Sequence, residues 1–228
     1  MTQNSSATKA TVAAVIRLAL GLIVIGAMLF WPAGTFDYWQ GWMWLAVLGL
    51  ALAFILVYLA QRDPALLDRR SRYRETRREQ RLIIALSALC YLAAFLLPGF
   101  DRRFGWSDVP AWVSIAAQIV VTASLVFIFL VYKINSYASR VIEVQEEQQV
   151  IASGPYALVR HPMYLGMMLM IIFSPLALGS YWAVPPTLIL PFLLAARAKD
   201  EETLLADELK GYREYMQKTR YRLFPGIW

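Results

Sequence analysis

The polar side chains best suited to chemistry gather in residues 154–166, GPYALVRHPMYLG. This segment holds the single histidine, His161, beside Arg160, and a long apolar stretch follows it. A glycine-proline pair signals a turn, and Pro162 fits the first turn of a new helix. Free backbone N–H groups at that helix start, with the Arg160 guanidinium beside them, would bind an anion such as a carboxylate. Alternatively, Arg160 reaches lipid headgroups and His161 caps the helix.

A second polar segment, RAKDEETLL, begins at Arg197. Arg197 and Glu201 are four residues apart and therefore share one face of a helix. Glu202 lies about a hundred degrees further round. Such spacing usually means a surface ion pair, but Arg197 follows directly on apolar residues. A charge at the edge of an apolar bundle is a candidate ligand group, so the two segments together predict a site for a charged ligand.

Long apolar blocks must position these segments. Hydrophobic residues make up 59% of the 228 residues, and charged residues make up 17%. Four blocks have the length of a bilayer-spanning helix. They are residues 11–31, 42–60, 82–98 and 110–132. Two shorter blocks, 163–178 and 181–196, are separated by a glycine and a serine. We therefore predict an all-α, polytopic membrane protein with about six membrane helices, the last two forming a hairpin.

We expect residues 1–228 to form a single membrane domain. Residues 1–132 would hold four membrane spans and a basic loop at 62–81, and residues 133–228 would carry the polar segments. Within the second half, residues 141–151 alternate apolar and polar side chains, which fits either a short strand or a loop on the membrane surface.

The arginines predict the orientation. Eight of them lie in the loop 62–81, whereas the loops 32–41 and 99–109 together hold two. By the positive-inside rule, both termini, the basic loop and residues 133–162 face the cytoplasm. The same loop would attract anionic membrane lipids. We expect no nucleic-acid partner, because no recognition module accompanies the arginines. We also expect no metal, because the chain has no cluster of histidines and cysteines.

Three motifs in order, GPYALVRHPMYLG, RAKDEETLL and GYREY with YRLFPGIW, resemble the isoprenylcysteine carboxyl methyltransferase family. That family lies within a wider group of membrane methyltransferases that includes phospholipid N-methyltransferases. The resemblance covers about residues 130–228. It implies an integral-membrane enzyme that uses S-adenosylmethionine. Residues 133–228 would form the cofactor-binding and catalytic half, with a pocket that faces the cytoplasm and is closed by a C-terminal cytoplasmic helix.

The resemblance assigns cofactor-binding roles by position. The residues are Gly154, Tyr156, Arg160, His161, Pro162, Tyr164 and Glu202. S-adenosylmethionine carries a carboxylate, an ammonium and a sulfonium group. Arg160, His161 and the helix start would hold the carboxylate. Glu202 would meet the ammonium, and a tyrosine ring would face a cation.

The resemblance also implies three catalytic residues, Arg197, Glu201 and Asn135. A carboxylate acceptor is ionised at neutral pH and needs no base, so Arg197 would clamp it with two hydrogen bonds while Glu201 orients Arg197. An amine acceptor must lose a proton, and Glu201 would then be the base. Asn135 corresponds to an asparagine that precedes the cofactor motif.

Three functions remain open from the sequence. The leading hypothesis is methylation of a lipophilic substrate that enters from the bilayer, most simply carboxyl O-methylation of an isoprenylcysteine-like compound, with phospholipid or amine N-methylation as the alternative. A second hypothesis is an NADPH-dependent membrane reductase of the sterol-reductase type. A third is a membrane protein without catalytic activity. The convergence of His161, Arg197 and Glu202 argues against the third, because a scaffold does not need it.

Overall fold

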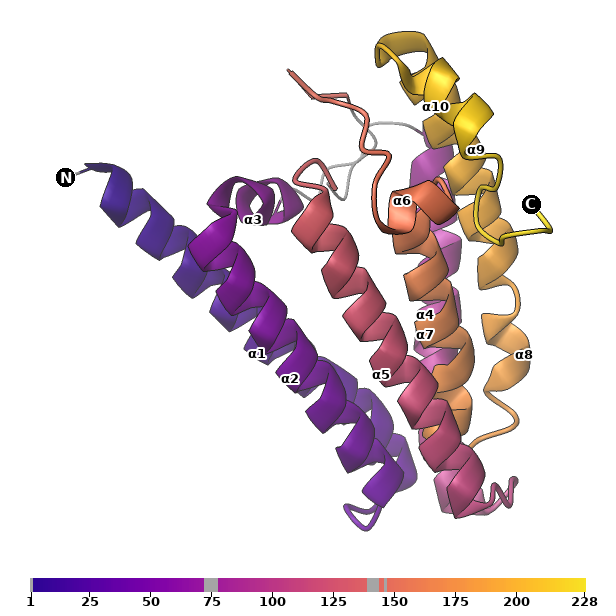
Figure 1. Ribbon diagram of the computed structural model, residues 1–228. Helices are drawn as coiled ribbons and strands as arrows, with labels where there is room; N and C mark the ends of the chain where they lie inside the picture. Colours follow the sequence, from indigo (N-terminus) through magenta and orange to yellow (C-terminus); the bar gives the residue numbers. More distant parts are fainter. Residues whose placement is uncertain (1, 72–77, 139–143, 146) are drawn as a thin grey trace.

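The computed structural model describes residues 2–71, 78–138, 144–145 and 147–228 (Figure 1). Within them every regular element is a helix, which confirms the predicted all-α class. The helices are α1 (Thr2–Ala33), α2 (Trp39–Arg62), α3 (Pro64–Ser71), α4 (Arg78–Phe104), α5 (Ala111–Ile134), α6 (Pro155–Leu158), α7 (Pro162–Ala177), α8 (Val184–Thr187), α9 (Leu190–Glu208) and α10 (Tyr212–Lys218). The described part of 141–151 holds no strand.

Four helices are long and apolar enough to cross a bilayer. Their apolar stretches are Thr11–Ala33, Trp39–Arg62, Gln80–Phe104 and Ala111–Ile134, and each contains the block expected from the sequence, the last but for one residue. Large apolar side chains such as Ile23 and Leu50 are exposed on their outer faces, where lipid would cover them. The chain therefore has the make-up of a polytopic membrane protein. The apolar helix α7 has only 16 residues, so a total of about six crossings stays a prediction.

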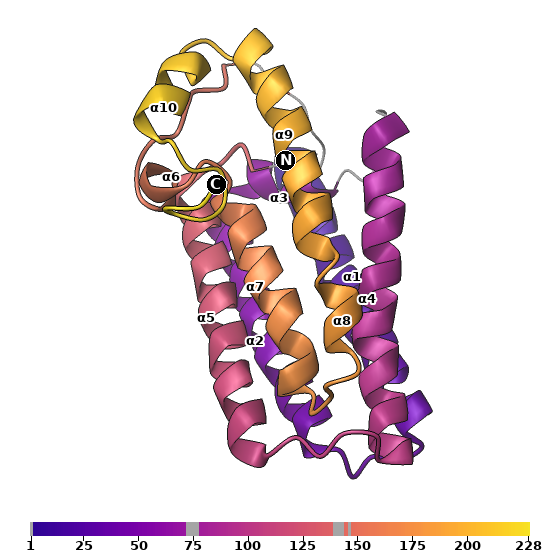
Figure 2. The same ribbon diagram turned by 90° about the vertical axis from the view of Figure 1, so that its right-hand side faces the viewer.

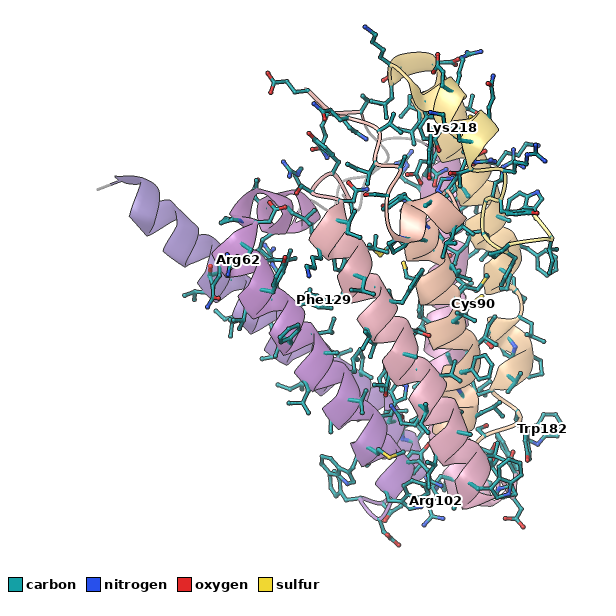
Figure 3. All side chains as sticks on the ribbon, in the orientation of Figure 1. Arg62, Cys90, Arg102, Phe129, Trp182 and Lys218 are labelled. Atoms are coloured by element: carbon teal, nitrogen blue, oxygen red, sulfur yellow. The ribbon has the colours of Figure 1, made fainter. Side chains whose placement is uncertain are left out.

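The polar elements gather at one end of the bundle, which we call the polar end and define as α3, α6, α10 and the last two turns of α9 (Figures 1 and 2). Both ends of the chain also lie toward it. Nitrogen- and oxygen-bearing side chains cluster there around Lys218, whereas Arg102 and Trp182 mark the opposite end (Figure 3). Helix α7 runs away from the polar end, and α8 and α9 return beside it in the opposite direction.

Close packing of α5 against α7 sets the position of the polar segment 154–166. A Cβ atom added to Gly166 would lie 2.7 Å from Cγ1 of Ile128, so only glycine allows this approach of the two helices. Gly154 adopts a φ of +58°, and a Cβ atom there would lie 2.5 Å from Cδ1 of Ile134. The glycines therefore bring the start of α7 against the last turn of α5.

Two arginines of the basic loop have structural contacts. Arg69 Nη2 donates to the carbonyl oxygen of Ser136 at 2.6 Å, and Arg70 Nη1 donates to that of Ala138 at 3.0 Å. The Arg70 guanidinium also lies 4.6 Å from the centre of the Tyr132 ring. These contacts tie α3 to the segment that follows α5. The remaining part of the predicted basic loop includes residues 72–77, which lie outside the described residues.

Candidate active site

A pocket of about 110 Å³ lies at the polar end, between the last turn of α5, α6, the start of α7, α9 and α10. Eight of the ten site residues predicted from the sequence line it. They are Asn135, Tyr156, Arg160, His161, Pro162, Tyr164, Arg197 and Glu201. Of the other two, Gly154 forms the turn before α6, and Glu202 lies behind the wall. The sequence motifs, which are up to 67 residues apart between Asn135 and Glu202, thus converge on one cavity.

The local backbone explains the convergence. The short α6 ends at Val159, which is extended, and His161 is the N-cap residue of α7. Pro162 occupies the first turn of α7, as its fixed φ favours. The chain therefore turns sharply between α6 and α7 and presents His161 and Tyr164 on one side of the helix start. Their rings are stacked, with centroids 5.4 Å apart and planes 6° apart.

A hydrogen-bonded chain crosses the polar side of the pocket. Arg197 Nε donates to the hydroxyl oxygen of Tyr164 at 3.0 Å, and that hydroxyl donates to Glu201 Oε2 at 2.6 Å. His161 Nδ1 lies 3.7 Å from the same carboxylate oxygen. Arg197 and Glu201 are thus linked through Tyr164, which the sequence had placed among the cofactor-binding residues. The side chain of Glu201 is 27% exposed, so it stands at the edge of the cavity.

Glu202 has a different environment from the one expected. Its carboxylate receives hydrogen bonds from Arg160 Nε at 2.6 Å and from Arg222 Nε at 2.7 Å, and His161 Nε2 lies 3.2 Å from Oε1. Burial raises the pKa of Glu202, but the hydrogen bonds from His161, Arg160 and Arg222 outweigh it and bring the pKa from 4.5 to about 2. Glu202 therefore joins α7, α9 and the C-terminal segment, and it does not face the pocket.

Two of the groups expected to bind an anion beside the start of α7, Arg160 and the backbone of His161, have partners inside the protein. The backbone N–H groups of Arg160 and His161 donate to the carbonyl oxygens of Tyr221 and Arg222, each at 2.9 Å. Arg160 Nη1 donates to the carbonyl oxygens of Thr219 and Arg220, each at 2.8 Å. This is a correction to the sequence-based expectation. The C-terminal segment, which the α7 motif alone does not reveal, satisfies these donors.

The other side of the pocket is aromatic and apolar. Leu205, Leu209, Tyr212 and Tyr215 form a buried cluster from α9 and α10, and Tyr156 packs against it. Tyr215 donates its hydroxyl to the carbonyl oxygen of Tyr156 at 2.8 Å. Burial raises the pKa of Tyr215 to about 12, so the phenol is protonated at neutral pH. The family resemblance implies a C-terminal helix that closes the pocket, but it does not single out Tyr212 and Tyr215 as lining residues.

Asn135 connects the end of α5 to this aromatic side. Its Nδ2 donates to the hydroxyl oxygen of Tyr156 at 2.6 Å, and its Oδ1 accepts from the N–H of Tyr137 at 2.9 Å. Burial raises the pKa of Tyr156 above its usual value, so this phenol is also neutral. Asn135 therefore sets the position of Tyr156 and of the turn after α5. Among the described residues no group of three or more histidines, cysteines and acids is arranged to hold a metal ion.

Fold and site together define an integral-membrane protein with a partly polar pocket at one end of its helices. Residues 113–207 match the family model of the isoprenylcysteine carboxyl methyltransferase (ICMT) family, which confirms the resemblance for this segment. The segment contains all ten predicted site residues. The family is one of methyltransferases, whereas α1 to α4, α10 and the third motif, GYREY with YRLFPGIW, lie outside the match.

A second comparison finds a similarity to a reductase over part of the chain. The chain is 31% identical over 84 residues to the Delta(14)-sterol reductase TM7SF2 of Mus musculus. The match covers 36% of this chain and 20% of the reductase, so the chain spans about one fifth of the length of that protein.

Proposed function

We propose that this chain is a membrane methyltransferase that uses S-adenosylmethionine and methylates a lipophilic acceptor. The observation that carries the proposal is the pocket itself. It places Arg197, Glu201 and His161 opposite buried tyrosines, directly at the ends of apolar helices and inside the family-matched segment. A lipophilic acceptor could reach such a site from the bilayer while a polar cofactor enters from water. From the arginine distribution we propose that this end faces the cytoplasm.

The donor set fits the cofactor. Glu201 is the carboxylate in the described wall of the pocket, so for a carboxylate acceptor we assign it, in place of Glu202, to the cofactor ammonium. Tyr212, Tyr215 and Leu209 offer flat and apolar surface for the adenine. The cavity of about 110 Å³ is open on one side, so part of a bound cofactor would extend beyond it. The bound cofactor would supply an activated methyl group.

The chain's own residues would orient the acceptor. The Tyr164 hydroxyl accepts a hydrogen bond from Nε of Arg197 and so fixes the orientation of the guanidinium at the pocket wall. A carboxylate acceptor meets a bidentate donor there and needs no proton transfer, which favours carboxyl O-methylation of an isoprenylcysteine-like compound. For an amine acceptor, Glu201 would take the proton, and N-methylation is the alternative. Most of the rate would come from alignment and exclusion of water.

A second candidate function is reduction by NADPH, because the chain shares 31% identity over 84 residues with the sterol reductase. NADPH phosphates require cationic donors. At this pocket Arg160 donates to Glu202 and to two backbone carbonyls, and Arg222 also donates to Glu202. Both guanidiniums are thus engaged inside the protein. Arg197 is the other arginine in the described wall, and one such guanidinium suits a carboxylate better than the several phosphates of NADPH, which favours the methyltransferase over the reductase.

Equilibrium binding of S-adenosylhomocysteine and NADPH to the detergent-purified protein, measured side by side, tests these two functions. We expect micromolar binding of S-adenosylhomocysteine and none of NADPH. Binding of NADPH alone would move the protein to the reductase class. Binding of neither compound would overturn both cofactor assignments.

A further inference from the structure

A glutamine from the first half of the chain contacts Arg197, a residue of the pocket wall. Gln80, in the first turn of α4, has an exposed fraction of 0%. Its Oε1 accepts from Arg197 Nη1 at 2.8 Å, and its Nε2 donates to the carboxylate of Asp200. Arg197 and Asp200 lie three residues apart on α9 and so face α4 together. Gln80 lies outside the family-matched segment, which begins at residue 113.

The hydrogen-bonding chemistry of Arg197 and Asp200 fixes the orientation of the Gln80 amide. An arginine only donates hydrogen bonds, and an ionised carboxylate only accepts them. The carbonyl of Gln80 must therefore face Arg197, and its NH₂ must face Asp200. A glutamate at this position would place two carboxylates against each other, and a lysine would place two cations together. Glutamine is the side chain of this length that satisfies both neighbours.

Two groups then hold Arg197 from different sides, because Tyr164 accepts from Nε and Gln80 accepts from Nη1. A planar guanidinium held at two nitrogens has a fixed plane. We propose that Gln80 is a positioning residue that fixes the Arg197 guanidinium for the acceptor carboxylate. The role rests on the proposed function and acts only through Arg197. It makes α4 part of the acceptor side, while the cofactor side is built from α6, α9 and α10.

The substitution Gln80→Met tests this role, because it keeps the length of the side chain and removes both hydrogen bonds. Gln118→Met is the matched control. Gln118 is a buried glutamine in α5 whose amide atoms have no hydrogen-bond partner in the described structure. With N-acetyl-S-farnesyl-L-cysteine as the acceptor, we expect Gln80→Met to lower kcat/KM about tenfold to hundredfold, mainly through KM, since the lost bond involves a charged group. We expect S-adenosylhomocysteine affinity within about twofold of wild type. Gln118→Met should match wild type in both.

An exchange of donor and acceptor separates positioning from packing. Gln80→Glu alone places a carboxylate against Asp200 and should lose activity. The double variant Gln80→Glu with Asp200→Asn restores a matched pair, because the carboxylate at position 80 accepts from Arg197 and from the new amide at position 200. We expect the double variant to recover most of the kcat/KM lost in the single one. A role limited to filling space between α4 and α9 would not give this recovery, because Gln80→Glu leaves the size of the side chain almost unchanged.

The outcomes separate this inference from the proposed function. An active wild type with an unchanged kcat/KM in Gln80→Met would overturn the role of Gln80 alone. Equal losses of acceptor and S-adenosylhomocysteine affinity would also overturn it, since they indicate a general structural effect. A wild type that binds S-adenosylhomocysteine but does not methylate this prenylated probe, while methylating an amine lipid, would exclude the carboxylate role. A wild type that binds no S-adenosylhomocysteine would overturn the proposed function itself.

Discussion

Replacement of Glu202 by alanine is expected to destabilise the protein strongly rather than to weaken cofactor binding selectively. The carboxylate is 3% exposed and is bound by Arg160 and Arg222, and Arg160 is itself 7% exposed. Removing one partner of a buried ion pair leaves an uncompensated charge, which costs about 3–5 kcal/mol. For a chain of this size, the apparent unfolding temperature in detergent should fall by about 6–20 °C.

The control is Glu208→Ala, which removes an exposed carboxylate from the same helix α9 and should leave the unfolding temperature unchanged. The family resemblance alone implies the opposite result for Glu202, namely a folded protein with weak cofactor affinity. If Glu202→Ala unfolded at the wild-type temperature but lost S-adenosylhomocysteine binding, the carboxylate would face the cofactor after all. The structure predicts lost stability because the Glu202 carboxylate on α9 binds both the residues just before α7 and the C-terminal segment.

The pH dependence of stability follows from the same carboxylate. The pKa of Glu202 is lowered in the folded protein from 4.5 to about 2. The stabilisation is fully present above pH 4.5 and is lost as the pH falls from 4.5 toward 2, where the folded-state carboxylate becomes protonated. Wild type should therefore lose stability in this window more steeply than Glu202→Gln, which cannot titrate there. Parallel curves for the two proteins would contradict the lowered pKa.

The fold class could be predicted because the length and apolar composition of a sequence block identify a bilayer-spanning helix. The blocks 11–31, 42–60 and 82–98 fall within the apolar stretches of α1, α2 and α4, and 110–132 matches that of α5 to within a residue. The short polar helices were harder to anticipate. Helix α3 has only eight residues, and its arginines looked like markers of orientation, yet Arg69 and Arg70 bind backbone carbonyls after α5. Such contacts depend on tertiary structure, which periodicity does not encode.

The site could be predicted only as far as its motifs reach. Spacing on one helix placed Arg197 and Glu201 on one face, and the structure joins them through Tyr164. The same reasoning could not tell which of two adjacent glutamates faces inward, because the answer depends on Arg222 in a distant segment. Gln80 carried no signal at all, since a single glutamine at the edge of an apolar block belongs to no motif. Its role appears only when α4 packs beside α9.

The substitution Arg197→Lys is expected to abolish most methyl transfer while leaving the cofactor side intact. Lysine keeps the positive charge but has no planar fork, so it cannot bind Tyr164 and Gln80 together and still present two parallel donors to a carboxylate. Loss of two hydrogen bonds to a charged group should reduce kcat/KM by about 10²–10³-fold. S-adenosylhomocysteine should bind within about threefold of wild type, because the aromatic side of the pocket has no described hydrogen bond to Arg197 and Tyr164 can still donate to Glu201 when lysine replaces Arg197.

The matched control is Arg213→Lys, an exposed arginine that pairs with Asp207 near the same end of the bundle. It should retain wild-type kcat/KM, because exposed ion pairs contribute little. If Arg197→Lys were fully active on the prenylated cysteine, charge alone would suffice and the bidentate clamp would be excluded. If it were inactive on that carboxylate yet active on an amine lipid, the site would be an N-methyltransferase site. In that case Glu201, held by Tyr164 at 2.6 Å, would be the group that takes the proton, and kcat would fall when Glu201 is replaced by glutamine.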